Sequence, residues 1–224
     1  SIRRQRQMCI RDRQVKDPSW YFLLQGPGRG ISMEDGTLVF ASQYIGNDRI
    51  PNAGIIYSKD HGKTWNISTL ARTNTTESQV AEVEPGVLML NMRDNRGGSR
   101  AVSTTTDLGK TWKEHESSRT ALQEPVCMAS LISVKAKENV LGKDILLFSN
   151  PNDAKNRHSI TIKASLDGGV TWLPENQLLL DAGWGWGYSC LTMIDKETVG
   201  ILYESSVAHM TFQAIKLKDI IKTK

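Results

Sequence analysis

Cysteines are few in this sequence, and no two of them lie at the spacing of a metal or redox site. The 224 residues contain only Cys9, Cys127 and Cys190, which are far apart. Zinc sites and thioredoxin-type sites use closely spaced cysteines, so both are disfavoured. No apolar run approaches the ~18 residues of a membrane-spanning helix, and no phosphate-binding loop is present. We therefore expect a soluble protein with no cofactor, no metal and no membrane insertion.

An excess of positive charge is also missing from the body of the chain. The net charge is +4, but residues 1–16 carry six basic side chains against Asp12, a net of +5. The remainder, residues 17–224, holds 28 − 6 = 22 basic and 24 − 1 = 23 acidic groups, a net of −1. Residues 1–16 could be an arm for nucleic acid or membrane, but a disordered or non-native tail is favoured because its apolar residues form no amphipathic pattern. We expect no nucleic-acid partner.

One motif, S/T-x-D-x-G-x-T-W, occurs three times. The copies span residues 58–65, 105–112 and 165–172. Their aspartates are Asp60, Asp107 and Asp167. The intervals between the aspartates are 107 − 60 = 47 and 167 − 107 = 60 residues, which is the length of a four-stranded propeller blade. The repeat therefore predicts a β-propeller.

Each copy has the chemistry of a turn. The aspartate is expected to accept backbone N–H bonds, the glycine to take a positive φ, and the tryptophan to bury its ring between sheets. An active site needs different groups that converge on one point, whereas here one group recurs. We therefore assign the three aspartates a structural role.

Short β-strands separated by turn residues fill the rest of the chain. Residues rich in Val, Ile, Thr, Tyr and Phe predict strands, and no long helix is expected. The predicted strands are residues 37–43, 53–58, 86–93, 100–106, 127–134, 144–149, 159–166, 189–194, 198–204 and 210–217. At about 50 residues a blade, positions 20–224 hold about four blades. The fold class is all-β, and a closed four-bladed propeller is one possibility.

The segments between the repeats resemble the bacterial exo-α-sialidases (neuraminidases), retaining glycoside hydrolases with a tyrosine nucleophile. The resembling segments are Gln25–Ile31, Thr76–Val83, Leu90–Arg93, Ser149–Pro151 with Arg157, Gly187–Leu191 and Leu202–Glu204. The resemblance extends from about residue 20 to residue 217. It implies a six-bladed sialidase propeller, of which about four blades are present in residues 17–224.

The resemblance also assigns roles to individual residues. Tyr188 matches the nucleophile and Glu77 its base, while Arg93 and Arg157 match two of three arginines that bind the substrate carboxylate. Glu204 matches the carboxylate that orients the first arginine. Arg29 lies in a segment that borders the pocket in relatives, and Trp184 and Trp186 could line that pocket. Without the resemblance, the charged residues would be interpreted as surface residues and the aromatic residues as packing residues.

The substrate explains the choice of residue types. Sialic acid carries a carboxylate on its anomeric carbon, so a carboxylate nucleophile would be repelled whereas a neutral tyrosine is not. Its phenol needs a base to become a good nucleophile. Guanidinium groups pair with both oxygens of the substrate carboxylate and keep their charge.

Two elements of the family pattern have no match. These are the first arginine, which belongs to an Arg-Ile-Pro motif, and the aspartate acid/base. Arg49-Ile50-Pro51 fits the tripeptide but lies too late in the chain order. Loss of the acid removes about 10² to 10⁴ in rate. We therefore expect an N-terminally incomplete piece of an exo-sialidase, with little or no activity.

Two alternatives remain open: a catalytically dead propeller that binds sialic acid, and a structural propeller that binds proteins. Linkage preference and the distinction between hydrolase and trans-sialidase also stay open. The expected partners are sialylated glycans or glycoproteins, and the protein is expected to be monomeric. The resemblance implies a periplasmic or secreted protein, although no signal peptide is visible.

Overall fold

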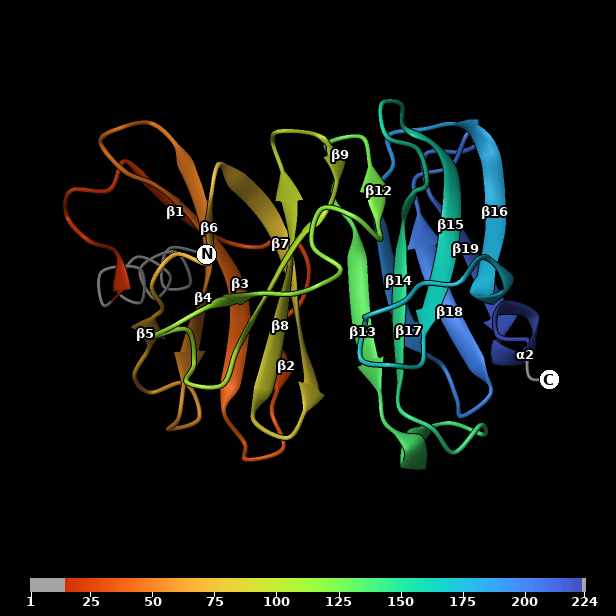
Figure 1. Cartoon of the computed structure of the whole chain (residues 1–224), viewed down its shortest axis with the longest axis horizontal. Helices are drawn as coiled ribbons and strands as arrows, with labels where there is room; N and C mark the ends of the chain where they lie inside the picture. Colours follow the sequence, from red (N-terminus) through yellow and green to blue (C-terminus); the bar gives the residue numbers. More distant parts are fainter. Residues whose placement is uncertain (1–14, 223–224) are drawn as a thin grey trace, which may run out of the picture. The chain divides into compact units, whose positions relative to one another are not determined.

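The computed structural model describes residues 15–222. The tail expected at residues 1–16 therefore lies almost wholly outside the described residues. Contacts within the chain divide it into two units. The first unit runs up to Met92 and includes Ser103–Lys113, and the second comprises Arg93–Val102 and the chain from Glu114 onward. Figure 1 shows β-strands throughout both units.

The first unit contains a six-stranded antiparallel sheet. Its central strands, β3 and β4, pair without a register shift. Val39 lies opposite Tyr57, and Ala41 lies opposite Ile55. Val39 and Ile55 are fully buried, because alternate residues of a strand point to the same side of the sheet. The strands of this sheet are β1 (Phe22–Gln25), β2 (Ile31–Ser32), β3 (Leu38–Ile45), β4 (Pro51–Ser58), β5 (Asn66–Ile67) and β6 (Arg72–Thr73).

The next sheet along the chain has four strands in the order β11-β10-β8-β7. Strands β12 and β9 form a separate two-stranded sheet. The up-and-down order of four strands is that of a propeller blade. The strands are β7 (Thr75–Glu84), β8 (Val87–Asp94), β9 (Gly98–Ser99), β10 (Ala101–Thr105), β11 (Lys113–Glu114) and β12 (Gln123–Glu124).

The second unit contains two further sheets, ordered β13-β14-β15-β16 and β17-β18-β19. Their strands are β13 (Ser130–Val134), β14 (Ile145–Pro151), β15 (His158–Ser165), β16 (Gln177–Trp184), β17 (Ser189–Met193), β18 (Thr198–Tyr203) and β19 (Thr211–Lys216). Three short helices accompany them: η1 (Ala136–Glu138), η2 (Pro174–Asn176) and α2 (Leu217–Ile220).

One hydrophobic core joins these two sheets. Leu147 and Ile162 from the first, and Leu191 and Ile201 from the second, are completely buried, and Leu217 of α2 closes the same cluster. Full burial of each such side chain stabilises the fold by about 1.5–3 kcal/mol. This core gives the connections that follow β16 and β18 a rigid support.

The three repeated turns share one hydrogen-bond pattern. In the first, the Ser58 hydroxyl donates to Asp60 at 2.8 Å, and the Thr64 amide and hydroxyl donate to the two carboxylate oxygens at 2.8 and 2.7 Å. Asp107 and Asp167 accept the corresponding bonds. Gly62 has a φ of +83°, which only glycine adopts without strain.

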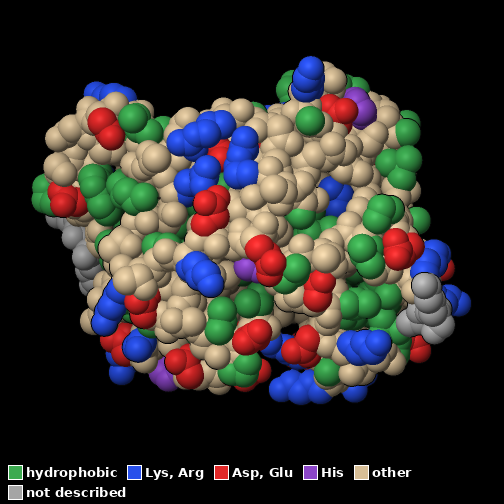
Figure 2. Space-filling view, viewed as in Figure 1, with side chains coloured by type: hydrophobic (Ala, Val, Ile, Leu, Met, Phe, Trp, Pro, Cys, Tyr) green, Lys and Arg blue, Asp and Glu red, His purple; other side chains and the backbone are tan. Residues whose placement is uncertain are grey.

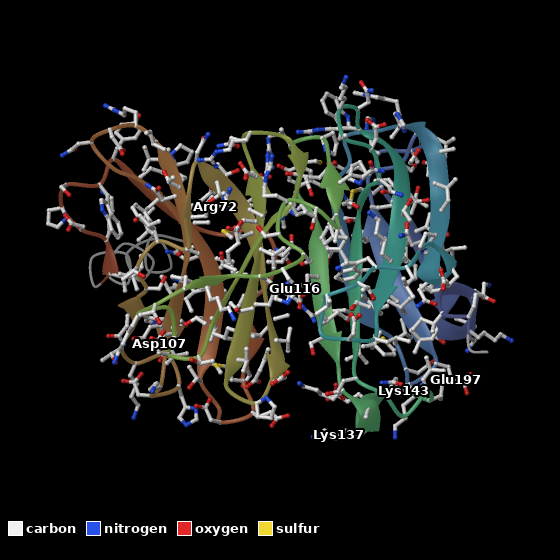
Figure 3. All side chains as sticks on the ribbon, viewed as in Figure 1. Arg72, Asp107, Glu116, Lys137, Lys143 and Glu197 are labelled. Carbon is white, nitrogen blue, oxygen red and sulfur yellow. The ribbon has the colours of Figure 1, made fainter. Side chains whose placement is uncertain are left out.

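The tryptophans of the turns differ more than their aspartates do. Trp172 is buried and meets Phe148 edge to face with ring centroids 5.7 Å apart. The indole of Trp112 instead donates to the Thr69 carbonyl at 3.1 Å and stays partly exposed. Figure 3 places Asp107 toward the lower end of the first unit.

All ten predicted strands are present, with ends displaced by up to three residues. The sequence analysis missed the long strands β7 and β16. In β7 the polar residues Ser78 and Gln79 are buried and interrupt the apolar pattern that marks a strand. In β16, Asp181 and Gly183 resemble turn residues. Asp181 nevertheless pairs with Ile160 of β15, and the register shifts on both sides of that pair.

No helix within the described residues combines the length and the apolar character needed to cross a membrane. Figure 2 shows acidic and basic side chains interspersed over much of the face in view.

Candidate functional site

Tyr188 lies at the end of the β16–β17 connection and is held at its backbone by Glu204. The Tyr188 amide donates to Glu204 Oε2 at 2.9 Å, and the Glu204 amide donates to the Tyr188 carbonyl at 3.0 Å. The second of these bonds continues the β17–β18 ladder by one residue beyond the pair Ser189 and Tyr203. The tyrosine is therefore fixed at a strand end with its side chain half-buried.

Arg93 reaches the phenol of Tyr188. It stands near the end of β8, and its Nη1 donates to Tyr188 Oη at 3.4 Å. A guanidinium group at this position stabilises negative charge that develops on the phenol oxygen. The two residues are 95 positions apart in sequence, and the fold of the second unit brings them together.

Arg157 supports the backbone in front of the tyrosine. Its Nη1 donates to the Trp186 carbonyl at 2.9 Å and its Nη2 to the Val126 carbonyl at 3.2 Å. Gly187, between Trp186 and Tyr188, has a φ of +90°, and a Cβ there would lie 2.7 Å from Pro151 Cγ. The connection therefore requires glycine at this point.

The Cys127 thiol interacts electrostatically with both arginines. Burial raises the pKa of its thiol to about 11, although Arg157 and Arg93 both act to lower it. The thiol is consequently neutral at physiological pH. Since both guanidinium groups act on one sulfur atom, Arg93 and Arg157 belong to the same small region of the second unit.

A buried ion pair lies beside this region, and the sequence analysis missed it. Arg100 Nη1 is 3.5 Å from Glu124 Oε2, and both side chains are excluded from water. Arg100 also donates to the Cys127 carbonyl at 2.7 Å, while the Cys127 amide donates to Glu124 at 2.7 Å. The other oxygen of Glu124 accepts the Asp94 amide at 3.2 Å. The ion pair therefore holds Asp94, which follows Arg93, and Cys127, which follows Val126.

Glu77 and Arg29 belong to the first unit. Glu77 is half-buried on β7, and Gln79, two residues on, has its side chain on the same face of that strand. The Gln79 amide donates to the Pro27 carbonyl at 3.2 Å and so holds the loop that carries the exposed Arg29. Of the predicted site residues, the second unit by itself brings together Arg93, Arg157, Tyr188 and Glu204.

The tripeptide Arg49-Ile50-Pro51 lies in the β3–β4 hairpin of the first unit. The Arg49 guanidinium stacks 3.9 Å from the centre of the Tyr21 ring, and the side chain is exposed. A cation over an aromatic face at an exposed site contributes about 0.5–1 kcal/mol. This contact gives Arg49 a structural role, and its exclusion from the substrate-binding arginines stays a prediction.

A family model described as "BNR repeat-like domain" matches residues 10–201. The chain belongs to this BNR repeat-like family. Its repeated turns and blade-like sheets are the features that such a repeat implies, and the predicted propeller fold is confirmed.

Sialidases are prominent among the relatives of this BNR repeat-like chain. A sialidase of Bacteroides fragilis is 79% identical over 209 residues, which are 93% of this chain and 38% of the relative. A sialidase of Micromonospora viridifaciens is 32% identical over 197 residues, 84% of this chain and 30% of the relative. The resemblance to bacterial sialidases is therefore confirmed. The chain spans about two-fifths of the length of the first of these.

Solved structures agree with the sequence relatives. The Hadza microbial sialidase Hz136 superposes with a TM-score of 0.91 at 75% identity, over 93% of this chain and 40% of that one. The intramolecular trans-sialidase of Ruminococcus gnavus superposes with a TM-score of 0.75 at 24% identity, over 92% of this chain and 46% of that one, and supports the fold alone.

Trp184 and Trp186 of the BNR repeat-like domain are exposed, not packed in a core. Their exposed fractions are 59% and 57%, and their ring centroids are 5.4 Å apart. They border a hollow of about 320 Å³ together with the turn at residues 205–209. Because both rings contact solvent, the tryptophans are not interior packing residues, which favours the expected role in lining a pocket.

The sequence contains signals for Arg100 and Glu124, the buried ion pair that the sequence analysis missed. Arg100 directly precedes the apolar pair Ala101–Val102, and Glu124 directly precedes the apolar run Pro125–Ala129. A charged side chain at a buried position is nearly always paired. Across residues 15–222, no three His, Cys, Asp or Glu side chains gather in a way that could hold a metal ion.

Proposed function

We propose that this chain is the part of an exo-α-sialidase that carries the nucleophile and two of the arginines that bind the substrate carboxylate. The whole protein hydrolyses terminal sialic acid from glycoconjugates with retention of configuration. The observation that carries the proposal is the 3.4 Å contact of Arg93 with the Tyr188 phenol, supported by the bond from Arg157 to the Trp186 carbonyl two residues before Tyr188. Its substrates are sialylated glycans and glycoproteins.

The arginines suit the anion of this substrate. The guanidinium groups of Arg93 and Arg157 neutralise the carboxylate on the anomeric carbon while positive charge develops on the ring. Hydrogen bonds to the Trp186 and Val126 carbonyls limit the motion of Arg157. An aligned guanidinium group loses less conformational entropy when it binds.

The covalent step uses Tyr188 as nucleophile. Its Oη forms a bond to the anomeric carbon while the bond from that carbon to the leaving oxygen breaks. The phenol proton passes to Glu77 as general base, and the leaving oxygen takes a proton from a general acid that we do not assign among these residues. Water then attacks the anomeric carbon and gives up a proton to the deprotonated general acid, while the bond from that carbon to Tyr188 breaks and the phenolate takes back the proton held by Glu77.

A fluorinated substrate tests this step without the acid. Fluoride leaves without a proton, so 2,3-difluorosialic acid should label Tyr188 even where no general acid is present. We expect a mass increase of one fluorosialyl group on the peptide that contains Tyr188, and none in Tyr188→Phe. Labelling of another residue, or equal labelling of Tyr188→Phe, would refute the assignment of the nucleophile.

A propeller that binds sialic acid without turnover is the competing function. Release of the fluorophore from a 4-methylumbelliferyl sialoside separates the two functions. Turnover that disappears in Tyr188→Phe supports the enzyme. Saturable binding of sialic acid that survives Tyr188→Phe, with no labelling and no release, supports the binding function.

The proposal includes the compartment and the assembly state. The sialidase resemblance favours a monomer that acts in the periplasm or outside the cell. Fractionation of producing cells and light scattering of the purified protein test these two points separately.

A further inference from the structure

We propose that the hollow between the two exposed tryptophans and the turn at residues 205–209 binds a neutral sugar residue of the glycan that carries the sialic acid. We call it the indole pocket; its lining residues are Trp184, Gly185, Trp186, Ser205, Ser206, Val207, Ala208 and His209. The inference rests on the proposed function. It adds the part of the substrate beyond the sialic acid.

The first wall of the indole pocket is made of two aromatic side chains in water. The Trp184 and Trp186 rings meet at an interplanar angle of 61° with more than half of each side chain exposed. A tryptophan side chain gains most from burial because of its large apolar area. A ligand that covers an exposed pair of tryptophans therefore gains binding energy from the apolar area that it buries.

The backbone of this wall is fixed by the arginine of the candidate site. The Trp186 carbonyl accepts Arg157 Nη1 at 2.9 Å, and the Gly185 amide donates to the Arg157 carbonyl at 2.9 Å. A Cβ at Gly185 would lie 2.8 Å from the Glu204 carbonyl oxygen, so the loop packs closely on the strand end. One connection thus supports the carboxylate-binding arginine with its backbone and presents the indoles to solvent.

The second wall is a turn held by hydrogen bonds within it and by hydrogen bonds to Asp181 of β16. Asp181 accepts the Ser206 amide at 2.7 Å and its hydroxyl at 2.8 Å. The Ser205 hydroxyl accepts the Ala208 amide at 3.0 Å and donates to the Ala208 carbonyl at 2.9 Å. With both walls held in this way, the indole pocket is formed before a ligand arrives. A preformed site avoids much of the entropy cost of binding.

The chemistry of the lining favours a neutral sugar. Of the lining residues only His209 can ionise, so the pocket offers little to an anion or a cation. Indole faces suit the apolar C–H face of a pyranose ring. The exposed Ser206 oxygen, whose proton is donated to Asp181, can accept a hydrogen bond from a sugar hydroxyl group. The volume of about 320 Å³ lies at the lower end of the range for small-molecule pockets.

The position of the indole pocket along the chain supports the same ligand. Trp186 precedes Tyr188 by two residues, and Ser205 directly follows Glu204. Both walls therefore continue from the segments that hold the proposed nucleophile. In Figure 1 the end of β16 lies at the upper edge of the second unit, whereas Figure 3 places Lys143 and Glu197 at its lower edge. The next sugars of a bound glycan would lie on the side where β16 ends.

Lactose, a neutral disaccharide without sialic acid, tests the indole pocket directly. Saturation-transfer NMR observed on lactose should show millimolar binding, and Trp184→Ala or Trp186→Ala should weaken it by about 10-fold. Phe212→Ala is the matched control, because Phe212 is 60% exposed on β19 but does not line the pocket. Equal binding by the tryptophan variants, or no lactose signal from the unmodified chain, would overturn the proposal. Near-ultraviolet circular dichroism verifies that each variant is folded.

The lactose experiment also separates this inference from the proposed function. Lactose has no carboxylate for Arg93 and Arg157 to bind, so its binding should survive Tyr188→Phe whether or not the chain has sialidase activity. Lactose binding without turnover would sustain the indole pocket and refute only the enzyme. If instead Trp184→Ala abolished a concentration-dependent self-association and left lactose unaffected, the tryptophans would belong to a protein contact and the inference would be wrong.

Discussion

Arg100 and Glu124 form an ion pair that is wholly excluded from water and that holds the Cys127 peptide from both sides. Arg100 donates to the Cys127 carbonyl at 2.7 Å, and Glu124 accepts the Cys127 amide at 2.7 Å. Because Glu124 also accepts the Asp94 amide, the pair connects the segment of Arg93 with the segment that supports Arg157. Its strength should therefore matter to both arginines.

Arg100→Met should reduce the free energy of unfolding by about 3–5 kcal/mol, because it leaves the Glu124 carboxylate buried without its partner. Urea denaturation measures the change. The double variant Arg100→Met with Glu124→Leu should recover part of the loss, since it removes both charges. Lys216→Met, which breaks the exposed pair with Glu197, is the control and should cost about 1 kcal/mol or less. A similar loss in both single variants would contradict the prediction.

Glu204→Ala should free the Tyr188 backbone. The lost bond to the Tyr188 amide joins a charged acceptor to a backbone donor, and such bonds contribute about 1.5–3 kcal/mol. Hydrogen exchange of the Tyr188 amide should accelerate by roughly 10- to 100-fold, as that energy implies. Glu204→Gln keeps an oxygen acceptor and should accelerate exchange less. Equal exchange in all three proteins would show that the carboxylate does not hold this amide.

The turn aspartates should make the stability of the fold depend on pH in the acid range. Hydrogen bonds from the Thr64 side chain and amide lower the pKa of Asp60 to about 2 from 3.8. The folded pKa is below the unfolded value, so this stabilisation is complete above about pH 4 and is lost as the pH falls toward 2. The carboxyl carbon of Asp60 should titrate near pH 2 in NMR. Thr64→Val removes one hydroxyl bond and should raise that midpoint, whereas a midpoint near 3.8 in the unmodified chain would refute the prediction.

Cys127 should resist thiol reagents in the folded protein, because its thiol is buried and its pKa is raised to about 11. Cys190 is exposed and provides an internal comparison. Mass spectrometry after brief iodoacetamide treatment at pH 8 should find Cys190 modified and Cys127 unmodified. In denaturant both should react. Rapid modification of Cys127 without denaturant would mean that the segment beneath the arginines opens.

The sequence was informative where a motif repeats and where strand-forming residues cluster. The spacing of Asp60, Asp107 and Asp167 predicted the blades, and the strand-forming composition of residues 37–43 predicted β3. The roles proposed for Tyr188 and Arg93 came from the resemblance to sialidases, since no local pattern relates two residues 95 positions apart. Such pairs form only when the sheets pack.

Buried polar residues explain most of what the sequence did not predict. In β7 the buried Ser78 and Gln79 conceal a strand from any rule based on apolar alternation. Arg100 and Glu124 are conventional surface residues by type, and only the fold shows that each is the partner of the other. The exposure of Trp184 and Trp186 likewise depends on how the β16–β17 connection lies against Arg157.

The hydroxyl and carboxylate bonds of each repeated turn join residues no more than four positions apart. Such a turn can form early in folding, because closing so short a loop costs little entropy. These hydroxyl and carboxylate bonds use no residue from outside the turn, although the second turn is also bonded to Thr69. A gene segment that encodes one blade can therefore be duplicated in tandem, and each new copy contains the residues that direct its own chain reversal.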